Sequence, residues 1–308
     1  MKKVIFSAMA FFCGVALIMG QNTAVGTTTG IFNIASNSQT GNLNYSSIDQ
    51  DGQMNVLGGV ANKAYNTQNG ISNWSSIDQQ GDRNTARINQ RGFMNKSTQS
   101  QGVGWAEDNI QVATQIGDEN VSSQLQRYDN NYASVYQNGH ENKVTQDQRS
   151  GANGVPGNKA WANQRGAHNE IMQTQYGQNN RARATQRFAY NYSNQDQTGN
   201  WNSSRVTQIG LGNKADIDQD GNRNRAITFQ GLAFNYVKSN QVGNGNYSKN
   251  TQFGIFNKFM GEQLGNNNSV TTLQIGFANK ITSSQTSNGD SFSTVQFGAF
   301  NSYANVQN

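Results

Sequence analysis

The side chains that most often carry catalysis or hold metals are scarce in this sequence of 308 residues. The two histidines, His140 and His168, fall in turns of different repeat units, far from the spacing of a metal-ligand pair. The only cysteine, Cys13, lies in an apolar N-terminal segment, so the rest of the chain has neither disulfides nor thiol chemistry. We therefore expect no catalytic, cofactor-binding or metal-binding residue and no cofactor, which argues against an enzyme.

Charged side chains recur at outward-facing positions of a repeat. Stacked acids such as Asp196 and Asp218 could collect divalent cations, but the Gly-Gly-x-Gly-x-Asp calcium signature is absent. A second column mixes Lys and Tyr, as at Lys214 and Tyr236, and could bind DNA or polysaccharide. The net charge of +5 is modest, so we interpret the cations as opposing lateral clumping while the rings support the sheet, and expect no specific nucleic acid.

Side-chain amides carry the dominant pattern. Gln recurs every 11 residues from Gln164 to Gln307, and Asn follows five residues after each of the first thirteen, with Asp290 as the exception. A period held this long indicates a repeat architecture. The amide columns expected to matter most contain Asn169, Gln175, Asn180, Gln186, Asn191, Gln197, Asn202, Gln208, Asn213, Gln219, Asn224, Gln230, Asn246, Gln252, Asn268 and Gln274.

Each unit of 11 residues predicts one strand and one turn. With Asn as position 0 and Gln as position 6, positions 2 and 4 hold small or apolar residues and positions 1, 3 and 5 hold polar ones, which is a strand with one buried face. A helical reading fails because a glycine in most units would cost roughly 1 kcal/mol each. The expected turn glycines include Gly41, Gly52, Gly81, Gly199, Gly210, Gly221, Gly243, Gly254 and Gly276.

The same alternation turns the Asn and Gln side chains inward. An unpaired buried amide is costly, but identical amides stacked about 4.8 Å apart can bond the ones above and below. Two facing strands joined by turns then form one coil of 22 residues. The sequence therefore predicts an all-β fold, a β-solenoid of two-strand coils of the cross-β type.

The repeat fills the chain after its first residues. Counting from Asn22 gives 25 strands, or about 12 coils, in a single domain over residues 21–308 that would form a rod about 60 Å long. Three turns are longer, after Gln50, Gln101 and Gln148, and all three follow odd-numbered strands. These three loops should all lie at one edge of the rod. They are either harmless length variation at exposed turns or a contact surface. From the seventh to the fifteenth strand, odd strands also carry Gln at position 4, which predicts a second Gln ladder.

Residues 1–20 resemble a secretory signal peptide. Lys2 and Lys3 precede an apolar run from Val4 to Met19, and Gly20 is a small residue before a cleavage point. A lipid anchor at Cys13 is disfavoured because Phe12 before it is bulky. Without this segment the formal charge falls to +3, and we expect no membrane insertion of the mature chain.

The motif Gln-x-Gly-x-x-Asn-x-[Ala/Ser]-x-[Ile/Val]-x-Gln, seen from Gln39 to Gln50 and from Gln208 to Gln219, resembles the curlin repeat of bacterial curli fibres. The resemblance implies a subunit of a secreted amyloid fibre at the bacterial cell surface, in biofilm matrix and adhesion. It also implies self-association, a nucleator subunit and an outer-membrane secretion pore as partners. No Gly-rich segment follows the leader, and major subunit and nucleator both stay open.

The ends of the repeat favour assembly on physical grounds alone. Motif strands run from Asn22 to Gln307 with no charged helix or proline to blunt either end. An uncapped solenoid exposes unpaired backbone groups, and head-to-tail contact between unlike ends yields a filament. The alternative is a monomeric surface solenoid, an adhesin that binds a ligand through its insertion-loop edge.

Overall fold

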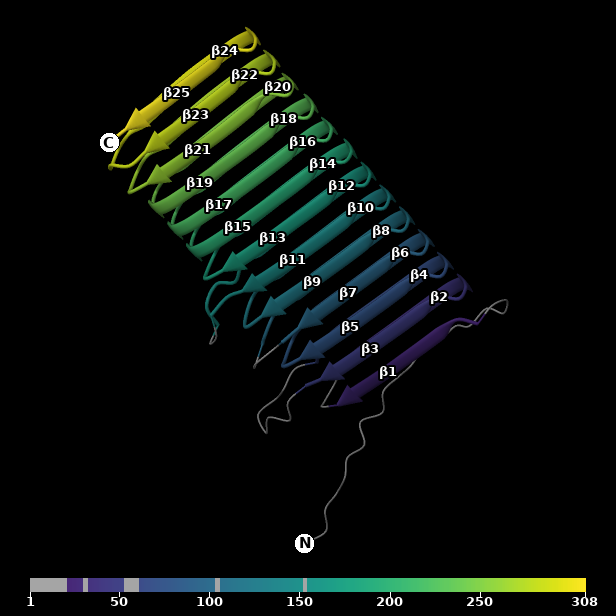
Figure 1. Cartoon of the computed structure of the whole chain (residues 1–308). Coiled ribbons are helices and arrows are strands. Elements are labelled where there is room, and N and C mark those ends of the chain that lie inside the picture. The colour runs from purple at the N-terminus through teal and green to yellow at the C-terminus, as the bar shows by residue number, and fades with distance from the viewer. Residues whose placement is uncertain (1–20, 30–32, 53–60, 103–105, 152–153) are drawn as a thin grey trace, which may run out of the picture.

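The computed structural model describes residues 21–29, 33–52, 61–102, 106–151 and 154–308. The expected signal peptide and most of the insertion after Gln50 lie outside these residues, as do parts of the other two insertions. Over the described part the chain forms 25 strands and no helix, which confirms the all-β solenoid (Figure 1). Within the same residues, no helix has the length and hydropathy needed to cross a bilayer.

The strands alternate between two parallel sheets that face each other. One sheet has 13 strands in the order of the odd numbers, and the other has 12 in the order of the even numbers. The odd strands are β1 (Thr23–Thr29), β3 (Tyr45–Asp51), β5 (Trp74–Gln80), β7 (Lys96–Gln101), β9 (Val121–Arg127), β11 (Lys143–Arg149), β13 (Glu170–Tyr176), β15 (Tyr192–Asn200), β17 (Lys214–Asn222), β19 (Tyr236–Asn244), β21 (Lys258–Leu264), β23 (Lys280–Gln285) and β25 (Ser302–Gln307). The even strands are β2 (Ile34–Asn42), β4 (Lys63–Ile71), β6 (Thr85–Phe93), β8 (Ile110–Asp118), β10 (Tyr132–His140), β12 (Lys159–Ala167), β14 (Arg181–Ala189), β16 (Ser203–Leu211), β18 (Arg225–Ala233), β20 (Tyr247–Ile255), β22 (Ser269–Phe277) and β24 (Ser291–Ala299).

Neighbouring strands pair in register, so equal positions of the repeat stack. Gln197 pairs with Gln219 and Gln208 with Gln230, each one coil of 22 residues apart. The register survives the longer connections, because Gln148 still pairs with Gln175 across the third one. These connections follow β3, β7 and β11, all in the 13-stranded sheet, so their described ends lie at one rim of the rod.

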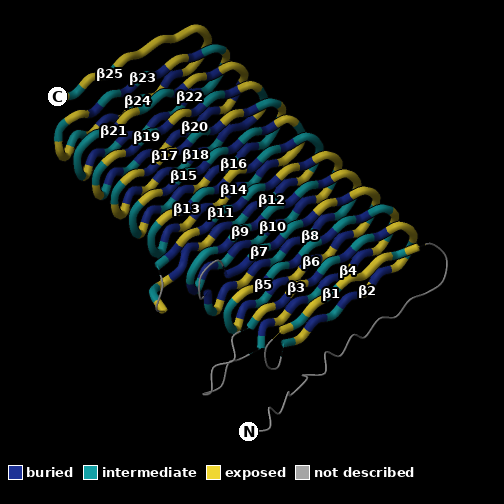
Figure 2. The backbone as a smooth tube through the Cα atoms, turned by 60° about the horizontal axis from the view of Figure 1, so that its bottom comes forward, coloured by how far each residue is buried: buried dark blue, intermediate teal, exposed yellow. Residues whose placement is uncertain are grey.

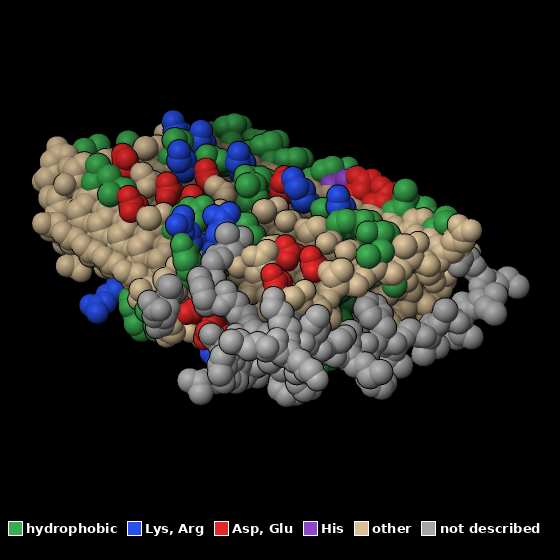
Figure 3. Space-filling model, turned by 90° about the horizontal axis from the view of Figure 1, so that it is seen from below, with side chains coloured by type: hydrophobic (Ala, Val, Ile, Leu, Met, Phe, Trp, Pro, Cys, Tyr) green, Lys and Arg blue, Asp and Glu red, His purple; other side chains and the backbone are tan. Residues whose placement is uncertain are grey.

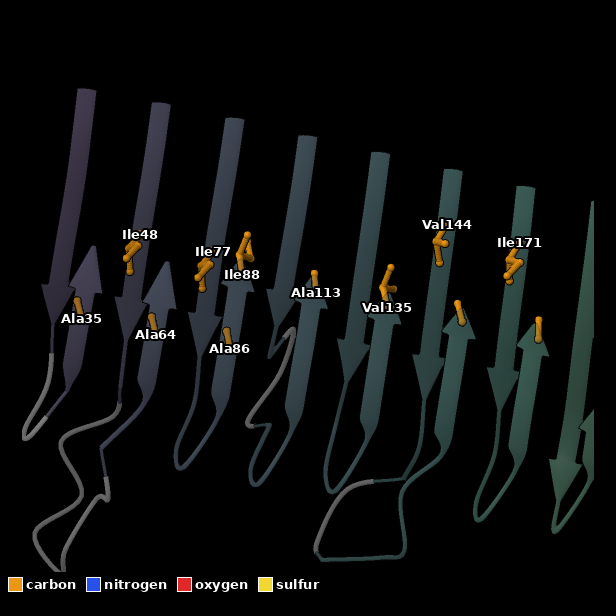
Figure 4. Close-up of a cluster of buried hydrophobic side chains, with 12 residues drawn as sticks. Ala35, Ile48, Ala64, Ile77, Ala86, Ile88, Ala113, Val135, Val144 and Ile171 are labelled. Carbon is orange, nitrogen blue, oxygen red and sulfur yellow. The ribbon is translucent and has the colours of Figure 1, made fainter. Parts of the chain in front are cut away.

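The interior between the sheets is partly amide and partly hydrocarbon. Inward positions are almost all buried from β2 to β24 and are intermediate or exposed in the terminal strands β1 and β25, while outward positions and turns are mostly intermediate or exposed (Figure 2). At positions 2 and 4 small and branched apolar side chains fill the space between the amide columns; Ile48 and Ile77 stack on adjacent coils, as do Val144 and Ile171 (Figure 4). Small side chains such as Ala64 and Ala86 fill many of these sites, and the one fully buried phenylalanine of the described chain, Phe259, lies against Gly261, which has no side chain.

The turns use a left-handed residue immediately before most of the repeat asparagines, which sequence reasoning did not foresee. In the described chain 21 residues other than glycine have positive φ, among them Glu141 (50°), Trp201 (62°) and Phe256 (59°). None of the 21 is Val, Ile or Thr. Branching at Cβ makes the left-handed region costly, so the sequence keeps β-branched residues out of these turn positions.

Candidate functional site: amide ladders and open sheet edges

Two uninterrupted Gln ladders run along the inside of the rod. In the 12-stranded sheet, Nε2 of each Gln donates to Oε1 of the Gln one coil further on, at 2.8 Å from Gln186 to Gln208 and 2.8 Å from Gln208 to Gln230. The 13-stranded sheet carries the equivalent ladder, with 2.8 Å from Gln175 to Gln197 and 2.7 Å from Gln197 to Gln219. The ladders extend from Gln39 to Gln296 and from Gln50 to Gln307.

Nearly every Gln amide of these two ladders also ties one sheet to the other. Nε2 of Gln208 donates at 2.8 Å to the carbonyl oxygen of Tyr192, which lies in the facing sheet, and Nε2 of Gln219 donates at 3.3 Å to that of Ser203. Both hydrogens of these amide groups therefore have acceptors, and the oxygen accepts from the coil before. The hydrogen bonds of a fully bonded buried amide offset its desolvation penalty, so this interior tolerates Gln where apolar side chains are usual.

The Asn columns bond mainly to the backbone, which differs from the amide-to-amide stacking that the sequence suggested. Oδ1 of Asn202 accepts from the backbone N–H of Asn224 at 3.0 Å, and Nδ2 of Asn202 donates to the carbonyl oxygens of Thr198 and Gly221. The Asn residues that precede the odd strands also form a hydrogen bond between their side-chain amides, as from Nδ2 of Asn213 to Oδ1 of Asn191 at 3.1 Å. The Asn side chain thus closes the turn before it and links that turn to the next coil.

The remaining predicted amide residues occupy equivalent places. Asn169, Asn180, Asn246 and Asn268 are buried and bonded as the Asn columns require, and Gln252 and Gln274 continue the ladder of the 12-stranded sheet. A further Gln ladder, at position 4 of the odd strands, joins Gln99, Gln124, Gln146, Gln173 and Gln195 at 2.7–2.9 Å, as the sequence predicts. This part of the rod therefore holds three Gln ladders at once.

The turn glycines form columns in which coils approach too closely for a side chain. Gly221 has φ of +118°, and a Cβ added there would overlap the carbonyl oxygen of Gly243 on the next coil. The other predicted turn glycines meet the next coil in the same way, with one exception. Gly52 differs from the others, because its φ lies outside the left-handed range and the nearest atom to an added Cβ, Oδ1 of Asn33, would be 3.3 Å away.

Both ends of the rod leave two strands with an open edge. β1 pairs only with β3 and β2 only with β4, while β24 pairs only with β22 and β25 only with β23. In the described part of the chain no segment pairs with the outer edge of any of these four strands. Each open edge presents backbone N–H and C=O groups at the spacing that another strand needs.

The structure brings the two histidines together, which their separation in the sequence concealed. His140 and His168 lie on adjacent coils with ring centroids 5.8 Å apart. Nε2 of His140 and Nδ1 of His168 lie 2.9 Å from the two carboxylate oxygens of Glu141, and Tyr190 stacks on His168. The in-register stacking of turns was the signal that could have found this cluster. Among the described residues, no group of three His, Cys, Asp or Glu side chains is arranged to hold a metal ion.

Stacked carboxylates on the outer face of the 13-stranded sheet have raised pKa values. Burial raises the pKa of Asp196 and of Asp218, and the neighbouring carboxylates add to the shift. Burial likewise raises the pKa of Asp78, next to Asp49, and of Asp147, where Arg127 and Arg149 oppose the effect. The same face carries Lys over tyrosine rings, with Nζ of Lys214 5.1 Å from the ring centre of Tyr192.

The two sheets and the two rims differ in chemistry. Outward positions of the 12-stranded sheet carry Arg87, Arg181, Arg183 and Arg205 and no acid, whereas the acid columns lie on the other sheet. The rim formed by turns after even strands exposes apolar side chains, with Met94 on the N-terminal side of the histidines and Phe256 and Phe300 on the C-terminal side; Phe300 is 75% exposed. Hydrophobic side chains lie on both sides of the histidines in Figure 3. The opposite rim carries an exposed Asn ladder, in which Asn222 bonds Asn244 and Asn244 bonds Asn266.

Comparison with known proteins identifies the repeat. The family model of the curlin associated repeat matches residues 196–221, which run from β15 to the end of β17 and include Gln197, Gln208 and Gln219. None of the curated proteins matches the chain. The matched repeat and the solenoid fold fit a curlin-like structural protein, and they point away from known enzyme families.

Proposed function

We propose that the chain, whose residues 196–221 match the curlin associated repeat, is a structural subunit of an extracellular amyloid fibre that grows by head-to-tail stacking of solenoids. Growth occurs where the last coil of one chain meets the first coil of the next. The new contact forms backbone hydrogen bonds in both sheets and extends amide columns across the junction, including the Gln column that begins at Gln39. The role of the fibre is mechanical: it contributes to the biofilm matrix and to adhesion.

The open edges at both ends carry this proposal. A soluble solenoid protects its terminal coils with a capping element, since an unpaired parallel edge templates another strand. Here the ladders reach the last coil that the structure describes, where Gln285 donates at 2.9 Å to Gln307. Nothing described beyond β1 and β2 or beyond β24 and β25 covers their edges.

The two ends are also complementary in the direction of their hydrogen bonds. Within the Gln ladders the donor always points toward the later coil, as from Gln263 to Gln285. In the Asn columns the donors belong to the later coil, as from Asn301 to Asn279. An incoming first coil therefore offers acceptors to the Gln column and donors to the Asn column of the last coil. Contact between unlike ends does not close, so it propagates as a fibre.

The cellular setting is part of the proposal and is supported by the curlin repeat and by the leader-like residues 1–20. We propose secretion to the cell surface, with an outer-membrane pore and a nucleator subunit as partners. The fibre itself needs no second protein, because the open ends are supplied by the chain.

Assembly is tested with the purified chain. We expect thioflavin T fluorescence to rise with a lag, sonicated fibres to abolish the lag, and electron microscopy to show unbranched filaments. Seeds of an unrelated amyloid should leave the lag unchanged, since their strands do not match this register. A chain that stays monomeric in sedimentation velocity for days at high concentration, seeded or not, would overturn the proposal.

A further inference from the structure

The solenoid has an odd number of strands, and this number dictates how two subunits can meet. The odd-strand sheet contains 13 strands and the even-strand sheet 12. We propose that successive subunits of the fibre are related by a half-turn about the fibre axis, so that each sheet of one chain continues into the other sheet of the next. This inference rests on the proposed function, because it concerns the junction between stacked copies.

Within one chain, each unit of 11 residues is followed by a unit in the opposite sheet, rotated by half a turn and raised by about 2.4 Å, half of the strand spacing. After β25, in the 13-stranded sheet, the next unit in this progression belongs on top of β24, in the 12-stranded sheet. If the next chain supplies that unit with its β1, its β2 falls on β25. The screw then continues through the junction without interruption.

Stacking without rotation breaks this progression. β1 of the incoming chain would sit on β25 and β2 on β24, so the two sheets would gain unequal numbers of levels per subunit. One level of the 12-stranded sheet would be empty at every junction, and the backbone N–H and C=O groups facing the gap would lose their partners. Buried backbone groups in native structures are almost always paired, so the half-turn is the favoured junction.

The side chains at the junction agree with the half-turn. With β2 placed on β25, Asn33 follows Asn301, Asn37 follows Asn305 and Gln39 follows Gln307. The column at position 4 is already an Asn ladder in the first coils, because Nδ2 of Asn66 donates to Oδ1 of Asn37 at 2.7 Å. Without rotation, β1 would place Gly26 on Asn305 and Thr28 on Gln307, and both amide columns would end.

The other half of the junction is less regular. β1 on β24 sets Thr28 against Gln296, so one Gln column passes through a hydroxyl at this point. The unrotated junction also places Thr28 in a Gln column, that of the other sheet. The presence of Thr28 therefore does not favour the unrotated junction over the half-turn. The half-turn keeps one Gln column and one Asn column of position 4 continuous, and it leaves no empty level.

The half-turn changes what the fibre presents to its surroundings. The rim with the described ends of the three insertions alternates from one side to the other along the fibre. The Arg-bearing face and the Asp-bearing face alternate as well. Each side of the fibre therefore carries the same mean charge over two subunits. The axial repeat becomes two subunits, or about 120 Å at the strand spacing.

Cysteine pairs at outward position 1 distinguish the two junctions. In a background with Cys13→Ser, which removes the only natural cysteine, we combine Ser302→Cys with Ile34→Cys in one variant and with Thr23→Cys in another. Adjacent strands are about 4.8 Å apart, within the range of Cα separations that a disulfide spans. Under oxidation of grown fibres, we expect the first variant to form covalent ladders on a reducing-sensitive gel and the second to stay monomeric.

A deletion reverses the expectation. Removal of residues 301–308 deletes β25 and leaves 24 strands, an even number that lets subunits stack without rotation. In this background Ser291→Cys should cross-link to Ile34→Cys, whereas in the full chain it should cross-link to Thr23→Cys. Cross-linked ladders from Ser302→Cys with Thr23→Cys in the full chain would overturn the half-turn. Cross-linking of Ser291→Cys to the same partner in the full and the shortened chain would overturn it too, and either result would leave the proposed fibre intact. A chain that grows no fibre overturns the proposed function and the junction with it.

Discussion

The side-chain amide of Gln208 donates to Oε1 of Gln230 across 2.8 Å, one coil further along the rod. Its second hydrogen is used within the same coil, by a carbonyl oxygen of the facing sheet. Gln at position 6 therefore performs two tasks that are usually separate in a sheet protein: it holds successive coils in register and it holds the two sheets together.

Replacing two ladder residues should weaken the rod and slow its growth. Gln208→Leu with Gln219→Leu removes the acceptor of one hydrogen on Nε2 of Gln186 and the donor to Oε1 of Gln230, and it does the same to Gln197 and Gln241 in the other ladder. Each buried unpaired group costs about 1–3 kcal/mol. We expect a lower guanidinium midpoint and a longer thioflavin T lag. Gln80→Leu is the matched control, because Gln80 is exposed and outside the ladders; equal effects at the two sites would contradict the role of the ladders.

The glycine columns should be intolerant of a single methyl group. Gly221→Ala combines the left-handed φ with an overlap on the carbonyl oxygen of Gly243, at a cost of about 2–5 kcal/mol. Gly289→Ala separates the two causes, because Gly289 has φ of +78° but no neighbour within 4 Å of the added Cβ. We expect this control to lose only about 1–2 kcal/mol. Equal denaturation midpoints for the two variants would show that the close approach of the coils is unimportant.

The fold could be derived from the sequence because every unit repeats the same few constraints. Alternation, turn glycines and the 11-residue period predict the strands, the burial of the amides and the register. What the period does not encode is where the second amide hydrogen goes or that Asn bonds to the backbone, since both depend on the distance between the two sheets. His140 and His168 illustrate the same limit, because chain separation hides neighbours that coil stacking creates.

The left-handed turn position supplies a test of backbone preference alone. Trp201 has φ of 62° and is exposed. Trp201→Asn should leave the unfolding midpoint nearly unchanged, because Asn adopts this region readily and already does so at Asn179 and Asn267. Trp201→Val should destabilise the rod by roughly 1–2 kcal/mol, since a β-branched residue is strained there. Chemical denaturation of the two variants side by side provides the measurement, and a Val variant as stable as the Asn variant would refute the argument.

Acidity should stabilise the rod. Burial raises the pKa of Asp196 and Asp218 in the folded chain above the value of about 3.9 expected when unfolded. Their contribution to stability is therefore complete below that value and is lost as the pH rises through the raised folded pKa values. We expect the free energy of unfolding to fall as the pH rises above about 4.

Substitution locates the effect. Asp196→Asn with Asp218→Asn should flatten this pH dependence and raise stability at neutral pH, because both sites then stay uncharged. Asp118→Asn is the control, since Asp118 is exposed and its oxygen still accepts from the backbone of Phe93 after the change. A pH profile that keeps its slope in the double variant would assign the dependence to other groups.

Mass per length of unstained fibres, measured with oriented fibre diffraction on the same sample, tests the central claim most directly. Stacked solenoids predict a meridional reflection near 4.8 Å together with one chain per roughly 60 Å of filament, because each chain supplies many levels of both sheets. One chain per strand spacing, as in an amyloid where every molecule adds a single layer, would contradict the account even though the reflection would be the same.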